Sequence, residues 1–370
     1  MVNKFFVQKR DIPKAGTEKN HRPILILFAL SVLFFVLSRH IPFRDVSRIE
    51  REMTEASRIM REAVDIIRGC QEERGITLDR DSDINMTGLI GLEFSPLTTS
   101  LGSLEAKRTT TNPNIAGLIV FLLDESSVRR GDTIAVGASG SFPALIVAVL
   151  SAAKALDLKP LVISSLGASQ WGANNPDFHL LHIHDCLLRN GIFDREPIAF
   201  SLGGDKDSEE DIIPGGLVSF LEETSKRGVL FIREHDLTRN VEKRMEAYKE
   251  KAGMNGIKAF INIGGNWSNI GDDSEILKLN PGLVKIKRIP PPQKRGVLFE
   301  MALRKTPVIH LLNIRGLVER YGLPWDPVPL PEPGDGKIYQ LAREKQLSFL
   351  ILAAFYIFLV IIFCIFRNRL

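Results

Sequence analysis

The chain has 370 residues, of which 44% are hydrophobic and 25% are charged, and its formal net charge is +4. This composition is typical of a globular protein and excludes a largely disordered chain. The basic residues are spread along the chain instead of forming one stripe, so we expect no nucleic acid among the partners.

Two apolar segments predict membrane helices. Residues 24–37 are apolar and no small-residue cleavage site follows them, so we predict an uncleaved transmembrane helix over residues 23–43. Residues 347–366 contain no charge and are long enough to cross the hydrocarbon core, which predicts a second transmembrane helix. The membrane lipid bilayer is therefore an expected partner.

The charges that flank these segments predict the orientation. A basic tail over residues 1–22 carries six Lys and Arg residues and is expected in the cytoplasm. With two spans, the basic tail over residues 367–370 is cytoplasmic as well, and the domain between the spans is extracytoplasmic. Arg39, Arg44, Arg48 and Arg51 follow the apolar stretch 24–37, so the charge bias is mild and the opposite orientation stays open.

The first element expected after this span is an amphipathic helix over residues 44–75. Apolar residues recur there at spacings of three and four: Val46, Ile49, Met53, Ala56, Met60, Ala63 and Ile67. The pattern predicts a membrane-proximal stalk that packs on the domain, with a partner-binding helix as the alternative. Residues 87–114, rich in Gly, Ser, Thr, Asn and Pro, then predict a long ordered loop or a strand with loops.

Residues 76–322 predict an α/β domain. Helical patterns alternate with short β-rich runs that begin near residues 133, 160, 198, 229, 258 and 307. This alternation predicts a Rossmann-like parallel sheet with helices on both faces, flanked by the N- and C-terminal transmembrane helices. Prolines over residues 323–346 predict a rigid tether to the last span.

Several predicted strands end in glycines and hydroxyl residues, as in "GASGS" (residues 137–141) and "SLGGDKD" (residues 201–207). The carboxyl ends of parallel strands share one edge, where backbone amides and glycines accommodate ligands. We therefore predict a ligand site at that edge, together with charged residues of the preceding loop. Its candidate residues are Glu105, Lys107, Arg108, Ser139, Ser141, Ser169, Gly203, Gly204, Asp205, Gly264, Gly265 and Asn266.

The motifs do not favour a nucleotide cofactor. "GASGSF" lacks the third glycine of the dinucleotide fingerprint and no P-loop pattern occurs, so we expect no cofactor. The same stretch is closer to the nucleophile turn of serine hydrolases, with Ser139 as the candidate catalytic residue. Asp205 or Asp207 and His310 complete the chain order of a Ser-Asp-His triad, although any long chain offers such a set by chance.

Histidines and cysteines give weaker signals. "HLLHIHD" contains His179, His182 and His184, and we interpret them as helix-surface residues and expect no metal site, because His184 points away from the other two and no cluster of carboxylates supports one. Of the three cysteines, Cys364 lies in the last apolar segment, which leaves Cys70 and Cys186 as potential partners in the domain. Cysteine usage alone does not indicate the redox compartment.

Four strings carry a resemblance to a known family: residues 87–114, "GASGSFPAL", "VISSLGASQWGANNPDF" and "NIGGNWSNIG". Together they resemble the poly-gamma-glutamate system protein family of bacterial membranes. The resemblance implies a role in making or exporting a γ-linked polyglutamate, with the synthase subunits as partners. It supplies no catalytic residues.

These observations together predict an accessory membrane protein of poly-gamma-glutamate synthesis or export. Its domain is expected to bind the anionic polymer, a glutamate precursor or synthase subunits at the sheet edge, where Lys107, Arg108 and Lys206 supply positive charge. The alternative is a hydrolase or transferase that acts on γ-glutamyl bonds through Ser139. The sequence does not decide whether the protein is an enzyme.

Overall fold

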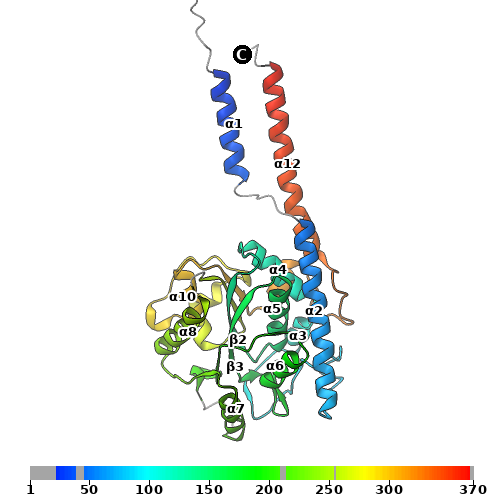
Figure 1. Cartoon of the computed structure of the whole chain (residues 1–370), viewed down its shortest axis with the longest axis vertical. Helices are drawn as coiled ribbons and strands as arrows, with labels where there is room; N and C mark the ends of the chain where they lie inside the picture. Colours follow the sequence, from blue (N-terminus) through cyan, green and yellow to red (C-terminus); the bar gives the residue numbers. More distant parts are fainter. Residues whose placement is uncertain (1–21, 39–45, 209–213, 254–255, 367–370) are drawn as a thin grey trace, which may run out of the picture. The chain divides into compact units, whose positions relative to one another are not determined.

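The computed structural model of the chain describes residues 22–38, 46–208, 214–253 and 256–366 (Figure 1). The basic tails expected over 1–22 and 367–370, apart from Arg22, and the end of the first expected span at 39–43 lie outside the described residues. The chain divides into two compact units. One comprises the apolar helices near the two chain ends, and the other comprises Asp45–Arg343.

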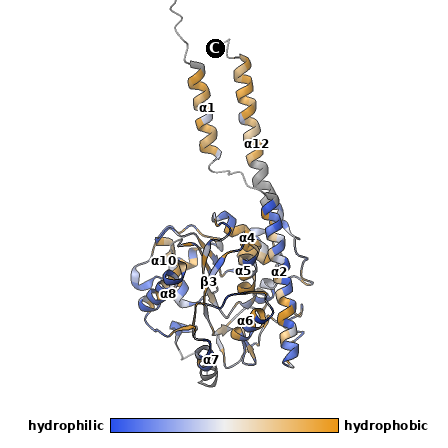
Figure 2. Ribbon diagram, viewed as in Figure 1, coloured by the Kyte–Doolittle hydropathy of each residue, from blue (hydrophilic) through white to orange (hydrophobic). Residues whose placement is uncertain are grey.

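The first unit contains α1 (Arg22–Ser38) and the apolar part of α12 (Lys337–Phe366), both strongly hydrophobic (Figure 2). Within the described residues, Phe349–Phe366 is the one helical stretch long and apolar enough to cross a membrane, whereas the apolar stretch Ile24–Ser38 is shorter. The hydroxyl of Tyr356 lies 2.9 Å from Ser31 Oγ, and its ring stacks on Phe34 at a centroid distance of 4.4 Å. One potential span is therefore found, and the predicted pair of spans is not confirmed.

The second unit is built on a seven-stranded sheet with the order β10-β11-β9-β2-β3-β7-β8. Neighbouring strands are parallel except for β10, which runs antiparallel to β11. The predicted α/β class is confirmed. The strands are β2 (Thr133–Ser139), β3 (Lys159–Ser165), β7 (Ala199–Ser201), β8 (Leu230–Ile232), β9 (Ile257–Ile263), β10 (Gly282–Leu283) and β11 (Val308–Leu311).

Helices cover both faces of this sheet because successive strand residues point to opposite sides. Val136 packs into one core and its neighbour Ala135 into the other. The first core contains side chains of α2 (Val46–Glu73), α4 (Asn114–Glu125), α5 (Pro143–Ala155), α6 (Leu180–Arg189) and α11 (Ile314–Tyr321). The second contains side chains of α8 (Leu237–Ala252) and α10 (Val297–Leu303), and α7 (Pro214–Arg227) and the single-turn α9 (Trp267–Ile270) complete the connections.

The amphipathic stripe expected over 44–75 forms α2 and packs on the domain. Its residues Met53, Ala56, Met60, Ala63 and Ile67 have no exposed surface. Burying one such Met or Ile side chain stabilises the fold by about 1.5–3 kcal/mol, so this helix is an integral part of the core. A disulfide between Cys70 in α2 and Cys186 in α6 fixes the two helices to each other.

The long segment before α4 contains a strand with loops, as one of the two predictions had it, and in addition a helix that was not predicted. It contains the short strand β1 (Thr98–Ser100) and the helix α3 (Leu104–Thr110). Ser103 begins this helix because its hydroxyl accepts a hydrogen bond from the Ala106 N–H, which is the usual N-cap arrangement. β1 pairs with β4 (Ala168–Ser169) in one small sheet, while β5 (Asn174–Asn175) and β6 (Phe178–His179) form a second small sheet.

The proline-rich segment is docked on the domain instead of being a free spacer. The side chain of Asn114 donates a hydrogen bond to the Glu332 carbonyl at 2.8 Å, and Arg61 donates to the Pro331 carbonyl at 3.0 Å. Helix α12 begins at Lys337, inside the predicted tether, and its Tyr339 hydroxyl donates to Asn114 at 2.8 Å. These contacts tie the segment to α2 and α4.

Candidate functional site

The carboxyl ends of β2, β3, β7 and β9 lie at one edge of the sheet because these strands are parallel. From β2 the chain moves through β3, β7 and β8 in one direction, and it then returns to β9 on the other side of β2. In open α/β sheets, ligands bind at the point where the strand order reverses. That point is here the gap between the ends of β2 and β9.

The predicted glycine and hydroxyl ends meet at this edge. Gly264 follows β9 with a φ of +78°, and a Cβ on it would lie 3.2 Å from Ser139 Cβ at the end of β2. Only glycine accepts both the backbone conformation and this close approach without strain. The structure thus brings two residues that are 125 positions apart in sequence, Ser139 and Gly264, into contact.

One face of the sheet becomes polar at this edge. On the side of α8 and α10, apolar strand residues such as Ala135 and Phe260 are succeeded by buried polar ones. Their neighbours Ala138, Ile263 and Leu311 face the other core and remain apolar. The polar layer comprises Ser139, Ser165, Ser201, Asn262 and His310. Burying polar side chains costs free energy unless they are hydrogen-bonded, so this layer needs hydrogen-bond partners within the protein.

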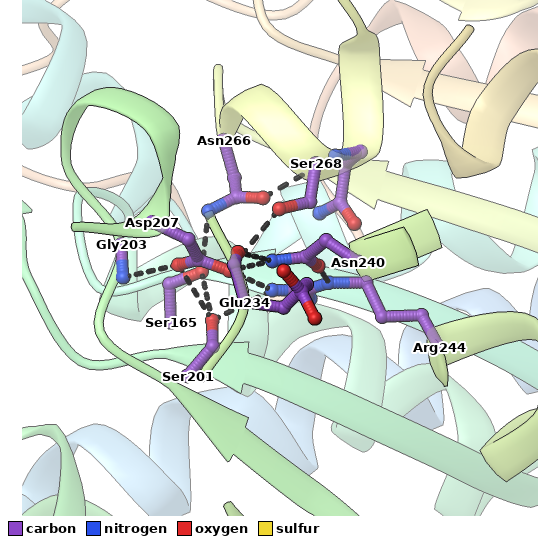
Figure 3. A network of polar contacts seen from close by, with 10 residues as sticks. Ser165, Ser201, Gly203, Asp207, Glu234, Asn240, Arg244, Asn266 and Ser268 are labelled. Carbon is purple, nitrogen blue, oxygen red and sulfur yellow. Dashed lines mark hydrogen bonds and ion pairs between the residues drawn. The ribbon is translucent and has the colours of Figure 1, made fainter. Parts of the chain in front are cut away.

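The centre of this layer is a buried ion pair (Figure 3). Asp207 and Arg244 are both fully buried, and Arg244 Nη2 lies 2.6 Å from Asp207 Oδ2. The carboxylate also accepts hydrogen bonds from the Ser201 hydroxyl at 2.9 Å, the Asn240 amide at 3.0 Å and the Ser268 hydroxyl at 3.1 Å. The network therefore joins the loop after β7 to α8 and α9.

The protonation state of Asp207 follows from these partners. Burial alone would raise the pKa of its carboxyl group, but Arg244 and the hydrogen bonds from Asn240, Gly203 and Ser201 outweigh burial and hold the pKa below its usual value. Asp207 is therefore ionised at neutral pH and its charge is balanced by Arg244. This pair orders the edge and offers no net charge to a ligand.

Asn266 connects the same layer to the loop after β9. Its side-chain amide donates to Ser165 Oγ at 2.6 Å, and its carbonyl oxygen caps α9 by accepting from the Asn269 N–H at 3.2 Å. Asn266 is itself 6% exposed. The predicted ligand residue thus has a structural role in holding the short helix α9 over the sheet edge.

Lys107 brings an unbalanced positive charge to this edge. Its side chain is 2% exposed, and Nζ donates to the Ser141 carbonyl and, at 2.7 Å, to Ser169 Oγ. Nζ also lies 3.8 Å from the centroid of the Phe142 ring. No carboxylate in the described part of the chain forms an ion pair with Lys107, and burial lowers its pKa to about 7.

Three serine hydroxyls extend from this lysine towards the point of strand reversal. Ser141 Oγ accepts hydrogen bonds from the Ser169 N–H at 3.0 Å and from the Ser139 hydroxyl at 3.0 Å. Ser139 and Ser169 are buried, whereas Ser141 is half-buried. The predicted residues Lys107, Ser139, Ser141 and Ser169 therefore form one cluster.

The remaining predicted residues lie in other settings. Arg108 makes a bidentate ion pair with Asp326 of the proline-rich segment, with an Nε–Oδ1 distance of 2.8 Å, so its charge is balanced. Glu105 is exposed and accepts a hydrogen bond from the Ser103 hydroxyl. Three further residues, Asp205, Lys206 and Gly265, are exposed at the rim, where Gly204 is half-buried.

The Ser-Asp-His triad is not assembled around Ser139. Ser139 is the last residue of β2, in regular register with Ser165, so it does not occupy a strained turn of the hydrolase type. Asp207 is engaged with Arg244, and His310 Nδ1 pairs with the side-chain amide of Asn262 at 3.0 Å. These contacts give no support to a triad of Ser139, Asp207 and His310.

Of the three histidines at α6, His179 and His184 are buried and His182 is half-buried, so they are not surface residues of the helix. His179 and His184 are 2% and 3% exposed, and burial lowers the pKa of each to about 4. His179, His182 and Glu223 form a compact group with the composition of a metal site. However, Nδ1 of His179 and Nδ1 of His182 each accept a hydrogen bond from a backbone N–H of the helix start.

Those hydrogen bonds determine which ring nitrogen of each histidine carries the proton. A neutral imidazole that accepts at Nδ1 carries its proton on Nε2, and the Nε2 atoms of both histidines face Glu223. A histidine that binds a metal usually donates from its other ring nitrogen, which is the opposite arrangement. The group is therefore best explained as the capping box of α6, held by Glu223.

The sequence of α8 contains one feature that indicates the buried ion pair between Asp207 and Arg244. In α8, Leu237, Val241 and Tyr248 form the buried stripe, and Arg244 occupies a position within that stripe. A charged residue in an otherwise apolar helix stripe indicates a buried partner of opposite charge. Nothing in the sequence identified Asp207 as that partner, because the contact spans 37 positions.

Comparison with known proteins gives no match, since no protein-family model, no curated protein and no solved structure matches this chain.

Proposed function

We propose that this protein is a membrane-anchored accessory component of poly-gamma-glutamate synthesis or export, and that its α/β domain binds the anionic polymer or its glutamate end. The observation that carries the proposal is the buried amine of Lys107 beside the strand reversal, which has no carboxylate partner among the described residues and whose protonated form an anionic ligand would stabilise. An uncompensated buried cation is unfavourable for the free protein, and an anionic ligand at the edge would relieve that cost.

The surroundings of Lys107 suit carboxylate groups. Hydroxyls of Ser139, Ser141 and Ser169 lie in one hydrogen-bonded cluster with it, and Lys206 is exposed at the rim of the same edge. Hydroxyls donate hydrogen bonds to carboxylates, and hydrogen bonds to ionised groups are stronger than neutral ones. A polymer with one carboxylate per residue would place one carboxylate against the serine cluster beside Lys107 and the next carboxylate near Lys206 at the rim.

Membrane anchoring through two helices is part of the proposal. The pairing of Tyr356 with Ser31 and Phe34 supports insertion of α1 together with α12, although α1 is the shorter helix. In a bilayer, hydroxyl pairs and close packing favour association between helices. The basic residues before α1 then favour cytoplasmic termini.

An extracytoplasmic position of the domain is supported by its disulfide. Cys70 and Cys186 are bonded, and structural disulfides persist in oxidising compartments but are rare in the cytoplasm. Polymer that leaves the cell passes this side of the membrane. The synthase subunits implied by the sequence resemblance are the expected protein partners there.

The decisive experiment measures binding of poly-γ-glutamate to the full chain in detergent micelles. Lys107→Met keeps the side-chain volume and removes the charge, and we expect the Kd to rise at least about tenfold, since a charge-assisted hydrogen bond contributes about 1.5–3 kcal/mol. Lys159→Met, at the exposed amino end of β3, is the matched control and should bind as the parent does. Equal affinity of a folded Lys107→Met variant would refute the proposed binding site.

A further inference from the structure

Ser169 is the serine of the Lys107 cluster whose hydroxyl contacts an amine. Its Oγ lies 2.7 Å from Lys107 Nζ, whereas the hydroxyl of Ser139 is hydrogen-bonded to another serine. Ser169 is held in place by the pairing of β4 with β1, in which the Gln170 N–H donates to the Ser100 carbonyl at 3.0 Å. The geometry of a hydroxyl and an amine at this distance is that of a nucleophile and its general base.

The contacts of Lys107 suit both of its protonation states. As an ammonium group, Nζ donates to the Ser141 carbonyl, to Ser169 Oγ and towards the face of the Phe142 ring. As a neutral amine, it keeps two donors for the carbonyl and the ring, and its lone pair accepts the proton of the Ser169 hydroxyl. A proton can therefore move between Ser169 and Lys107 without leaving either group unsatisfied.

The protonation balance agrees with this geometry. Burial lowers the pKa of Lys107 to about 7, so a large fraction of the amine is neutral near neutral pH. Ser169 is 5% exposed, and the half-buried Gly102 lies beside its hydroxyl. A Cβ on Gly102 would lie 3.2 Å from Ser169 Oγ, so the glycine keeps this approach to the hydroxyl free of a side chain.

We propose that Ser169 and Lys107 form a nucleophile and general-base pair for acyl transfer on amide bonds of an anionic chain. The choice of a γ-linked glutamyl amide as substrate rests on the proposed function. The alternative nucleophile suggested by sequence, Ser139, lacks the contact with a base that Ser169 has.

The chemistry is balanced with the groups present. Ser169 Oγ attacks the γ-carbonyl carbon while its proton moves to Lys107 Nζ, which gives a tetrahedral intermediate. The C–N bond then breaks as Lys107 returns the proton to the leaving amine, and an ester to Ser169 remains. Attack by water completes hydrolysis, and attack by the amine of another glutamate completes transfer; in each case Lys107 accepts the proton of the incoming group and returns it to Ser169.

The test treats the full chain in detergent micelles with a fluorophosphonate probe, and with γ-glutamyl-p-nitroanilide as the chromogenic amide. We expect mass spectrometry to find the phosphonate on Ser169, and nitroaniline release to fall at least 100-fold in Ser169→Ala and in Lys107→Met. Ser225→Ala, at an exposed position of α7, is the matched control and should retain labelling at Ser169. The labelling rate of the parent should rise with pH through about 7 as Lys107 loses its proton.

The outcomes separate this inference from the proposed function. No labelling, or labelling at Ser139, in a preparation that still binds poly-γ-glutamate would overturn the Ser169–Lys107 pair and leave the binding proposal intact. Labelling at Ser169 in a protein that does not bind the polymer would support the pair and reject the polymer as ligand. Ser169→Cys keeps a nucleophile at the position, and its alkylation by iodoacetamide should depend on Lys107 in the same way if the pair is correct. Equal rates with and without Lys107 would contradict the pair.

Discussion

Arg244 and Asp207 form an ion pair with an Nη2–Oδ2 distance of 2.6 Å, and neither side chain has exposed surface. The pair joins α8 to the loop after β7, and Asn240, Ser201 and Ser268 complete the hydrogen bonding of the carboxylate. The Gly203 N–H donates to the same carboxylate, and Ser201 links the network to Ser165, which Asn266 contacts.

Removal of one partner should destabilise the domain strongly. Asp207→Asn leaves Arg244 buried without a counter-charge, and we expect the free energy of unfolding to fall by about 3–5 kcal/mol. Denaturant unfolding of the full chain, followed by circular dichroism, measures the change. Lys249→Met, on the exposed face of α8, is the control and should change stability by less than about 0.5 kcal/mol. A loss of similar size in both variants would contradict a special role for the pair.

The same pair predicts sensitivity to acid. The pKa of Asp207 is lowered in the folded state, so its contribution to stability is complete above the unfolded pKa of about 3.9 and is lost as the pH falls through the lower folded value. Unfolding measured from pH 5 to pH 2 should show this loss in the parent chain. The Asp207→Asn variant should have a shallower dependence, and an unchanged slope would exclude Asp207 as its source.

Buried histidines should give a second pH dependence at higher pH. Burial lowers the pKa of His179, His182, His184 and His310 to about 4, below the unfolded value of about 6.5. Between these values the unfolded chain binds protons that the folded chain does not, so stability should fall as the pH decreases from about 6.5 to 4. His310→Leu should reduce this slope, with the exposed His235→Leu as the matched variant. The prediction fails if His310→Leu retains the full slope.

The disulfide should contribute substantially to stability. Cys70 and Cys186 are 116 positions apart, and closing a loop of this length stabilises a fold by about 2–5 kcal/mol. Reduction by dithiothreitol, or Cys70→Ser, should lower the unfolding midpoint, and non-reducing electrophoresis should show a more compact parent chain. Cys364→Ser removes the cysteine in α12 and should change neither property.

The contact between α1 and α12 should be detectable by cross-linking in the membrane. Replacement of Tyr356 by the photoreactive p-benzoyl-phenylalanine should give a cross-link to α1 on illumination, identified by mass spectrometry, because the parent tyrosine hydroxyl lies 2.9 Å from Ser31 Oγ. Tyr356→Phe keeps the ring stack on Phe34 and removes the hydrogen bond, so we expect a loss of about 0.6 kcal/mol in helix association. Absence of a cross-link to α1 would argue against paired insertion of the helices.

The local sequence determined the elements of this protein because each depends on neighbours along the chain. The period of apolar residues identified α2 and the helices of the α/β domain, and the glycine and serine ends of the strands pointed to one sheet edge. The short helix α3 was missed, although Ser103 in front of it is a regular N-cap residue. That error placed Lys107 in a loop rather than on a helix.

Tertiary structure alone decided which charges are balanced. Lys107 and Arg108 are adjacent and equivalent in sequence, but Asp326 neutralises Arg108 across 218 positions while Lys107 is buried against hydroxyls and a ring. The same holds for the disulfide between Cys70 and Cys186 and for the Asp207–Arg244 pair. Whether a charge is balanced or buried depends on its neighbours in space. Those neighbours are distant in the sequence, and they come together only when the sheet places its parallel strand ends at one edge.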